Sequence, residues 1–331
     1  MDASFTLLLI VIVFGLVFEF VNGFHDAANA VATIIATRVL SPWAAVSMAG
    51  LLNFVGAVTG LAVAATVGTG LVDPSAVTLT TVAAGLLAAI LWDLATWYYG
   101  IPSSSSHALL FGVLGAGVAT SGFGAVIIGG VELVGLGIIY SPVIGLLGAA
   151  AIVIVIYRLF HDSRPTMVRR LFARLQLLSS AYMAYSHGGN DGQKTMGILA
   201  LALFTYGTYD SFYVPLWVIV AAAGSMGLGT AVGGFRIVKT MGFKLVKLDS
   251  PHGFAAETAA ATVIEVATRF GVPISTTHAI NGALIGVGTV KNRKAVSWGV
   301  ARNIVTAWVL TLPACFVLGW VLLKVATAAG L

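Results

Sequence analysis

The chain has 331 residues, of which 59% are hydrophobic and only 9% are charged, whereas an ordinary soluble domain carries roughly 25% charged residues. This composition excludes a soluble globular domain, and the single cysteine excludes an intramolecular disulfide. The formal net charge of +5 does not indicate nucleic-acid binding, because many basic residues lie in short loops beside apolar segments. We therefore expect an all-α, multi-pass protein of the cell membrane, embedded in the lipid bilayer and without a nucleic-acid partner.

The first apolar segment, residues 4 to 37, contains the polar motif NGFHDAANA. It has no basic residues ahead of the apolar run, which predicts a retained span rather than a signal peptide. Polar residues inside a membrane usually line a substrate or ion path. The alternative is that they only join neighbouring helices by hydrogen bonds. The polar residues of this segment recur at helical spacing on one predicted face: Glu19, Asn22, His25, Asp26 and Asn29.

Two further spans are predicted at about residues 43 to 71 and 78 to 98, followed by the string GIPSSSSH. Pro102 is expected to open a helix, because proline suits a first helical turn. The hydroxyls and unpaired N–H groups of Ser104, Ser105 and Ser106 would then form an anion site at the positive end of the helix dipole. We expect residues 101 to 121 to form a re-entrant hairpin.

Spans near residues 125 to 140 and 143 to 157 complete the first half, with Pro142 predicted to break the helix between them. The chain then divides into a first repeat at residues 1 to 157, a basic cytoplasmic linker at residues 158 to 174 and a second repeat at residues 175 to 331.

The second half repeats the plan of the first. When Asp191 is aligned on Asp26, the motif SHGGNDGQK corresponds to NGFHDAANA. The string GIPSSSSH likewise recurs as GVPISTTH 171 positions further along. The second string supplies another hydroxyl cluster, formed by Ser275, Thr276 and Thr277. The predicted spans of this half lie near residues 212 to 235, 253 to 270, 296 to 311 and 314 to 326, with Pro313 as a second break.

The two polar motifs differ at one informative position. Asn29 stands three residues after Asp26, but Lys194 stands three residues after Asp191. The spacing allows Lys194 to pair with Asp191 on a helix. Either the lysine simply neutralises the aspartate, or its ammonium stands where a bound cation would sit.

Short basic loops mark the cytoplasmic side. Placing Arg38 and residues 158 to 174 there requires an outside N-terminus. Each repeat is expected to have about five crossings plus a hairpin, and because five is odd, the second repeat is inverted relative to the first. Inverted repeats with broken helices near the midplane are typical of secondary transporters. One group contradicts the rule, since Lys291, Arg293 and Lys294 would lie outside.

The paired motifs, together with GFAAE at residues 253 to 257, resemble the inorganic phosphate transporter (PiT) family of cation-coupled symporters across essentially the whole chain, and HGGNDGQK resembles its bacterial low-affinity members. The resemblance implies a transporter rather than an enzyme, with no cofactor and an inverted repeat. It implies phosphate contacts at Ser104, Ser105, Ser106, Ser275, Thr276 and Thr277. It implies cation coupling by Asp26, Asn29, Asn190, Asp191 and Glu257, supported by Glu19, Asn22, His25, His107, Lys194 and His278.

Several alternatives remain open. A proton is favoured over sodium as the coupling ion, because Lys194 would replace one cation and a buried carboxylate can carry a proton. A sulfate permease is the runner-up, since helix N-termini bind either anion. An intramembrane hydrolase is disfavoured, because the motifs are doubled and no G-x-S-x-G elbow is present. A divalent metal travelling with phosphate and a homo-oligomer are also left open.

Overall fold

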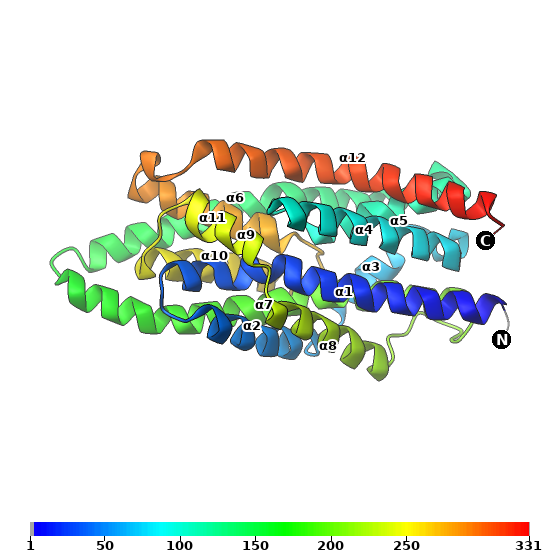
Figure 1. Cartoon of the computed structure of the whole chain (residues 1–331), viewed down its shortest axis with the longest axis horizontal. Coiled ribbons are helices and arrows are strands. Elements are labelled where there is room, and N and C mark those ends of the chain that lie inside the picture. The colour runs from blue at the N-terminus through cyan, green and yellow to red at the C-terminus, as the bar shows by residue number, and fades with distance from the viewer. Residues whose placement is uncertain (1–2, 331) are drawn as a thin grey trace.

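The computed structural model describes residues 3–330, and every regular element in that range is a helix (Figure 1). The first half contains α1 (Ala3–Ala36), α2 (Pro42–Ala57), α3 (Ala62–Thr69), α4 (Leu79–Tyr99), α5 (Ser105–Ser121) and α6 (Ile128–Leu159). The second half contains α7 (Pro165–Tyr206), α8 (Leu216–Val232), α9 (Phe235–Lys239), the π-helical turn η3 (Thr240–Leu245), α10 (Ser250–Arg269), α11 (Thr276–Lys291) and α12 (Trp298–Ala328).

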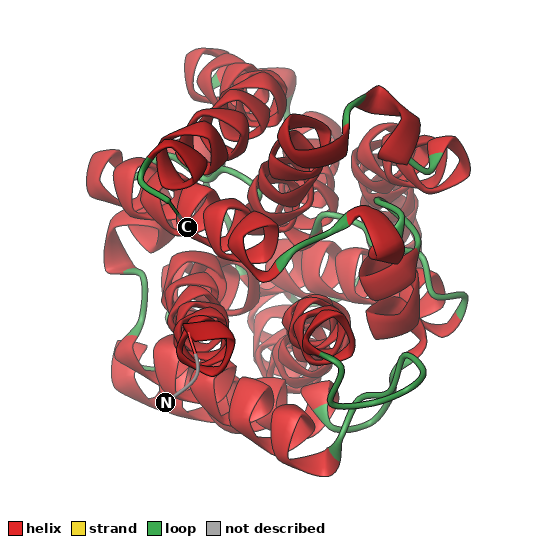
Figure 2. Cartoon of the chain, turned by 90° about the vertical axis from the view of Figure 1, so that its right-hand side faces the viewer, coloured by secondary structure: helices red, strands yellow, loops and turns green. Residues whose placement is uncertain are grey.

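The two halves contain corresponding elements in the same order. A bent pair follows the long first helix of each half, with an angle of 72° between α2 and α3 and of 54° between α8 and the α9–η3 segment. The halves also interlock reciprocally, because α1 packs on α8 while α2 packs on α7, and α5 packs on α12 while α11 packs on α6. Figure 2 shows the resulting bundle along its length, with both termini at the same end.

Glycines allow the closest helix contacts across the halves. Gly23 of α1 lies against the backbone of Met226 in α8, and Gly188 of α7 lies against the backbone of Asn53 in α2. A Cβ atom at Gly188 would come within 2.1 Å of the Asn53 carbonyl oxygen. Small residues at such positions let helices approach closely where the surrounding lipid offers no hydrophobic driving force.

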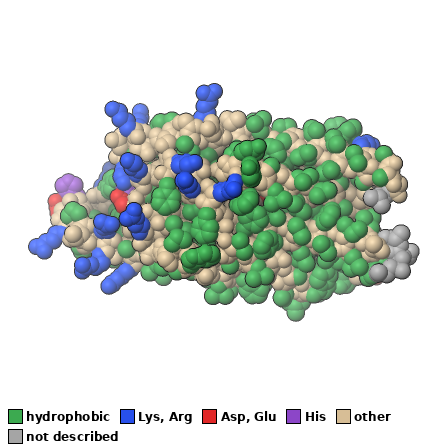
Figure 3. Space-filling view, viewed as in Figure 1, with side chains coloured by type: hydrophobic (Ala, Val, Ile, Leu, Met, Phe, Trp, Pro, Cys, Tyr) green, Lys and Arg blue, Asp and Glu red, His purple; other side chains and the backbone are tan. Residues whose placement is uncertain are grey.

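Four helices, α1, α4, α6 and α12, are long and apolar enough to cross a membrane, and the number rises to six if each bent pair forms one span. Hydrophobic side chains cover most of the flank between the ends of the molecule (Figure 3). The protein is therefore a multi-pass membrane protein, as its composition predicts.

The predicted proline breaks are wrong. Pro142 lies inside the continuous α6 and Pro313 inside the continuous α12, so neither helix is divided into two spans. A proline removes only one intrahelical hydrogen bond, and neighbouring helices stabilise such positions in membranes. Pro142 is packed by α11, where Gly282 lies directly against its backbone. Each half consequently has fewer full crossings than the five expected.

The polar motifs do not break their helices either, since α1 and α7 run unbroken past Asp26 and Asp191. Residues 165 to 174 of the expected basic linker form the first turns of α7.

The predicted hairpin within residues 101 to 121 is also wrong. That stretch holds a short loop and one helix, α5, which pairs with the preceding α4; α11 pairs with α10 in the same way. The α4–α5 pair opens towards the C-terminal end of the bundle, which means that the helix ends remote from the connecting loop lie there. At this end, Lys324 donates to the carbonyl of Ala119. The α10–α11 pair opens at the opposite end, beside the α6–α7 turn (Figure 1), since Asp249 and Lys291 line a cavity with Phe160 and His161. The two tips meet at Asp191, which accepts from Ser106 and Thr276.

The basic residues gather towards the end of the molecule that contains the α6–α7 turn (Figure 3). Lys291 belongs to this end, because it lines a cavity with Phe160 and His161. The expectation that Lys291, Arg293 and Lys294 lie opposite the 158 to 174 segment is therefore wrong. The reason is that Asp249, just before α10, and Lys291, at the end of α11, are 3.2 Å apart, so both lie at this end.

Candidate functional site

Two glycines of left-handed conformation lie in the loops that join α4 to α5 and α10 to α11. Each loop, together with the first turn of the helix that follows it, forms the tip of a helix pair. Gly100 (φ 65°) ends α4 and Gly271 (φ 68°) follows α10, and glycine reaches this region of φ without steric cost. Each is followed by a proline in the connecting loop, so the prediction that Pro102 opens a helix is wrong. The helices start at the N-caps Ser104 and Ser275, whose hydroxyl oxygens accept from the backbone N–H groups three residues later.

The carboxylate of Asp26 lies between the two helix tips. His25 Nδ1 donates to Asp26 Oδ1 over 2.6 Å, and Ser105 of α5 donates to the same oxygen over 3.4 Å. Thr277 of α11 donates to Oδ2 over 3.2 Å, while Asn29 donates to the hydroxyl of Thr277 over 2.9 Å and to that of Thr276 over 3.2 Å. Both tips are therefore tied to one face of α1.

Asp191 occupies the equivalent position on α7. Ser106 of α5 donates to its Oδ1 over 3.2 Å, and Thr276 of α11 donates to its Oδ2 over 2.9 Å. Lys194 Nζ donates to three oxygens, those of Asp191 Oδ1 at 2.5 Å, Ser106 Oγ at 2.6 Å and the Ile274 carbonyl at 2.7 Å. The ammonium thus binds oxygens from three separate elements, and all of these side chains are buried.

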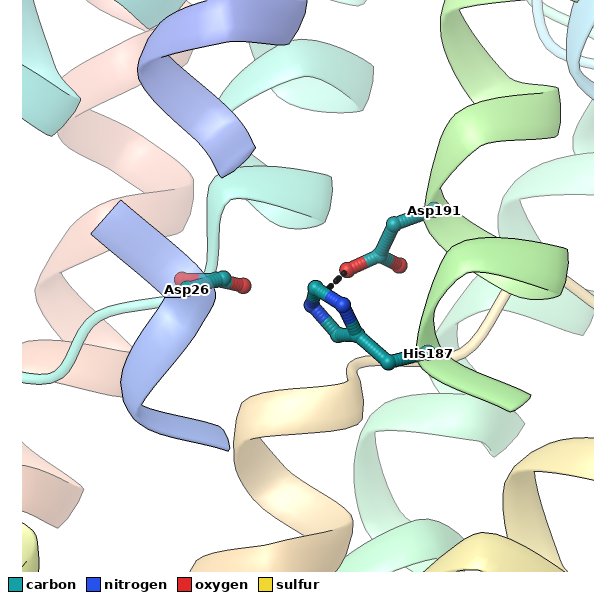
Figure 4. Close-up of side chains that lie close together, drawn as sticks. All are labelled: Asp26, His187 and Asp191. Carbon is teal, nitrogen blue, oxygen red and sulfur yellow. Dashed lines mark ion pairs between the residues drawn. The ribbon is translucent and has the colours of Figure 1, made fainter. Parts of the chain in front are cut away.

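His187 completes the centre, and the sequence analysis missed it as a site residue. Its Nε2 lies 3.2 Å from Asp191 Oδ2, and its ligand atom and those of Asp26 and Asp191 all lie within 4.8 Å of one another (Figure 4). A signal was available, because His187 precedes Asp191 by four residues, one helical turn. Two carboxylates and an imidazole could hold a cation.

The hydrogen bonds of His187 limit what its ring can do. Asn53 donates its amide N–H to Thr230 over 2.8 Å, so its Oδ1 is an acceptor. His187 Nδ1, 3.1 Å from that oxygen, must be the donor. The other nitrogen, Nε2, lies 3.2 Å from Asp191 Oδ2 and has no hydrogen bond among the described residues.

Several of the predicted coupling or supporting residues lie apart from this centre. Glu257 of α10 accepts from Thr33 of α1 and from Ser179 and Gln176 of α7. Thr33 stands seven residues beyond Asp26, roughly 10 Å along the helix. Glu19, seven residues before Asp26, accepts from Thr195.

Asn190 is also directed away, because it donates to Thr268 over 2.8 Å and fixes α7 against α10. His25 makes the corresponding contact in the first half, with Nε2 3.0 Å from the hydroxyl of Thr96 in α4. Asn22 is buried on α1.

The two predicted supporting histidines lie side by side. The ring centroids of His107 and His278 are 4.7 Å apart, and His278 stacks on Trp308 at 3.9 Å. Neither ring nitrogen of His107 has a hydrogen-bond partner among the described residues. The pair packs the two helix starts against each other and contributes no contact to the carboxylates.

The fold defines a multi-pass helical membrane protein with a buried polar centre between two helix tips. The description "Phosphate transporter family" matches residues 22–319 of the chain. Among curated relatives, a "Probable low-affinity inorganic phosphate transporter" of Rhizobium meliloti (strain 1021) is 48% identical over 95% of both chains. One with the same description from Bacillus subtilis (strain 168) is 41% identical, covering 96% of this chain and 97% of its own.

A solved structure described as "The sodium-dependent phosphate transporter" superposes with a TM-score of 0.91, at 25% identity, covering 98% of this chain and 99% of the other. The chain belongs to the phosphate transporter family. It is accordingly a transport protein rather than an enzyme.

Proposed function

We propose that this protein is a cation-coupled symporter of inorganic phosphate that binds the anion between the N-termini of α5 and α11. The observation that carries the proposal is the convergence of hydroxyls from both tips, Ser105 and Ser106 on one side and Thr276 and Thr277 on the other, upon the same pair of carboxylates. Helix N-termini favour anions through their free N–H groups and dipoles. The relatives described as phosphate transporters support the choice of substrate.

The arrangement of the two halves supports transport by alternating access. We propose that the halves are inverted copies and that α4–α5 and α10–α11 are re-entrant hairpins, since the pairs open at opposite ends and meet at the site. The gathering of basic residues at the α6–α7 end (Figure 3) supports a cytoplasmic location for that end and an outside N-terminus in the cell membrane.

We propose the proton as the coupling ion, and Lys194 is the main support. Its ammonium has three oxygen neighbours at 2.5–2.7 Å, as a bound cation would, yet a covalently fixed charge cannot be transported. The unpartnered oxygen of the buried Glu19 carboxyl offers a group that can take up a proton. Sodium is the alternative, because the similar solved structure is described as sodium-dependent and carboxylate oxygens suit that ion.

Uptake by the purified protein in proteoliposomes separates the two ions. With a proton gradient and no sodium, we expect phosphate to accumulate; with a sodium gradient at constant pH, we expect no stimulation. The variant Lys194→Asn, which copies Asn29 at the equivalent position, is expected to gain a sodium response. Accumulation by the unmodified protein that follows sodium and ignores the proton gradient would refute proton coupling.

Sulfate is expected to compete poorly with phosphate at neutral pH. Hydrogen phosphate still carries a proton that it can donate to a carboxylate such as Asp26, whereas sulfate has only acceptor oxygens and would be repelled. The measurement is uptake of labelled phosphate in the presence of rising sulfate, with unlabelled phosphate as the control competitor. Equal inhibition by both anions would favour the sulfate permease alternative.

A further inference from the structure

A basic cavity lies outside the transport site, at the start of α7. It has a volume of ≈ 390 Å³ and is lined by Arg164, Thr166, Met167, Arg170, Leu171 and Arg174. The three arginines are exposed, and none of their guanidinium groups has an ion pair or hydrogen bond with another described residue. No acidic residue lines the cavity, and the neighbouring Asp162 is 2.9 Å from His161 instead. The cavity is therefore a concentrated and unneutralised positive site.

Apolar side chains share the same face of the helix. Met167, Leu171 and Leu178 follow the arginine positions at spacings of three, four and seven residues, which keeps them on one stripe. Their side chains are 47%, 37% and 69% exposed. The stripe begins with charge at the basic end of the molecule and continues with exposed apolar surface along α7, so a bound molecule would meet both kinds of surface.

We infer that this stripe binds an anionic phospholipid, with the phosphate on Arg164, Arg170 and Arg174 and an acyl chain along Met167, Leu171 and Leu178. The guanidinium group matches phosphate oxygens in bidentate geometry and is weakly hydrated. Anionic lipids of the cytoplasmic leaflet attract basic segments beside the membrane. The start of α7 adds the positive end of its dipole. A soluble anion would use the arginines but leave the apolar half of the stripe uncovered.

Native mass spectrometry of the full-length protein with added phosphatidylglycerol or phosphatidylcholine tests the site. We expect the unmodified protein to prefer phosphatidylglycerol over phosphatidylcholine. The triple variant Arg164→Gln, Arg170→Gln, Arg174→Gln should bind phosphatidylglycerol more weakly, by at least about tenfold. The matched control Lys244→Gln, Arg293→Gln, Lys294→Gln removes the same number of exposed charges and should keep the preference. The triple replacement by lysine should retain only part of the binding, because it keeps the charge but loses the bidentate geometry of the guanidinium groups.

Three results would overturn the inference. The glutamine triple could bind phosphatidylglycerol as well as the unmodified protein, or the control triple could lose binding equally. Excess inorganic phosphate could displace phosphatidylglycerol, which would indicate a soluble-anion site. If the glutamine triple does not fold, as judged by gel filtration, the single variants Arg170→Gln and Arg174→Gln serve in its place, and unchanged lipid binding in both would equally contradict the site.

Discussion

Replacing Asp191 by asparagine is expected to destabilise the protein by about 3–5 kcal/mol, the range for removing one partner of a buried ion pair. The substitution leaves the buried Lys194 ammonium without its carboxylate, which lies 2.5 Å away in the native protein. Thermal unfolding in detergent measures the effect. Phosphate uptake by the same variant should be lost, because Asp191 also binds the hydroxyls of Ser106 and Thr276.

Two variants act as controls for this charge effect. Asp26→Asn removes the equivalent carboxylate where no lysine is paired with it, so uptake should be lost with a smaller decrease in stability. The double variant Asp191→Asn, Lys194→Met removes both charges and should recover much of the stability without recovering transport. If Asp191→Asn and Asp26→Asn unfold at the same temperature, Lys194 does not depend on Asp191 as the structure indicates.

Removing one hydroxyl from either helix tip is expected to weaken phosphate binding by roughly one to two orders of magnitude, because a hydrogen bond to a charged group contributes about 1.5–3 kcal/mol. The variants are Ser106→Ala in α5 and Thr277→Val in α11. The measurement is the concentration dependence of phosphate uptake in proteoliposomes. The two variants should behave alike, since each hydroxyl contacts an aspartate from one half of the protein.

Thr289→Val is the matched control for the hydroxyl variants. Thr289 also belongs to α11, but its hydroxyl donates to the carbonyl of Ile285 in the same helix over 2.8 Å, so uptake should remain unchanged. A symmetric anion site would be disproved if one tip tolerated the loss of its hydroxyl while the other did not.

The asymmetry between Asn29 and Lys194 connects these variants to coupling. Asn29 donates to the hydroxyls of Thr276 and Thr277, and the ion-pair partner of Asp26 is His25. Lys194 neutralises Asp191 and is bound at the same time by the tips of both helix pairs. The two halves of the site therefore differ in the group paired with the aspartate, which is a histidine beside Asp26 and a lysine beside Asp191.

The sequence by itself determined the membrane location, and it predicted the duplication and the residue types of the site. Composition and helical periodicity are local properties, so apolar segments of spanning length could be recognised without knowledge of their neighbours. The aspartates of the paired motifs and the hydroxyls of the paired helix starts could be located for the same reason. Recurrence of NGFHD as HGGND and of PSSSSH as PISTTH indicated that the two sets belong together.

Only the tertiary structure decided which of these residues meet and how the helices are divided. Pro142 and Pro313 remain inside helices because neighbouring helices pack around them, and α5 pairs with α4 rather than folding on itself. Asp26, Asp191 and His187 converge because α1 and α7 face the same two tips, whereas Glu257 finds its partners on other turns of those helices. Contacts between residues so far apart in sequence depend on helix packing, which no local pattern specifies.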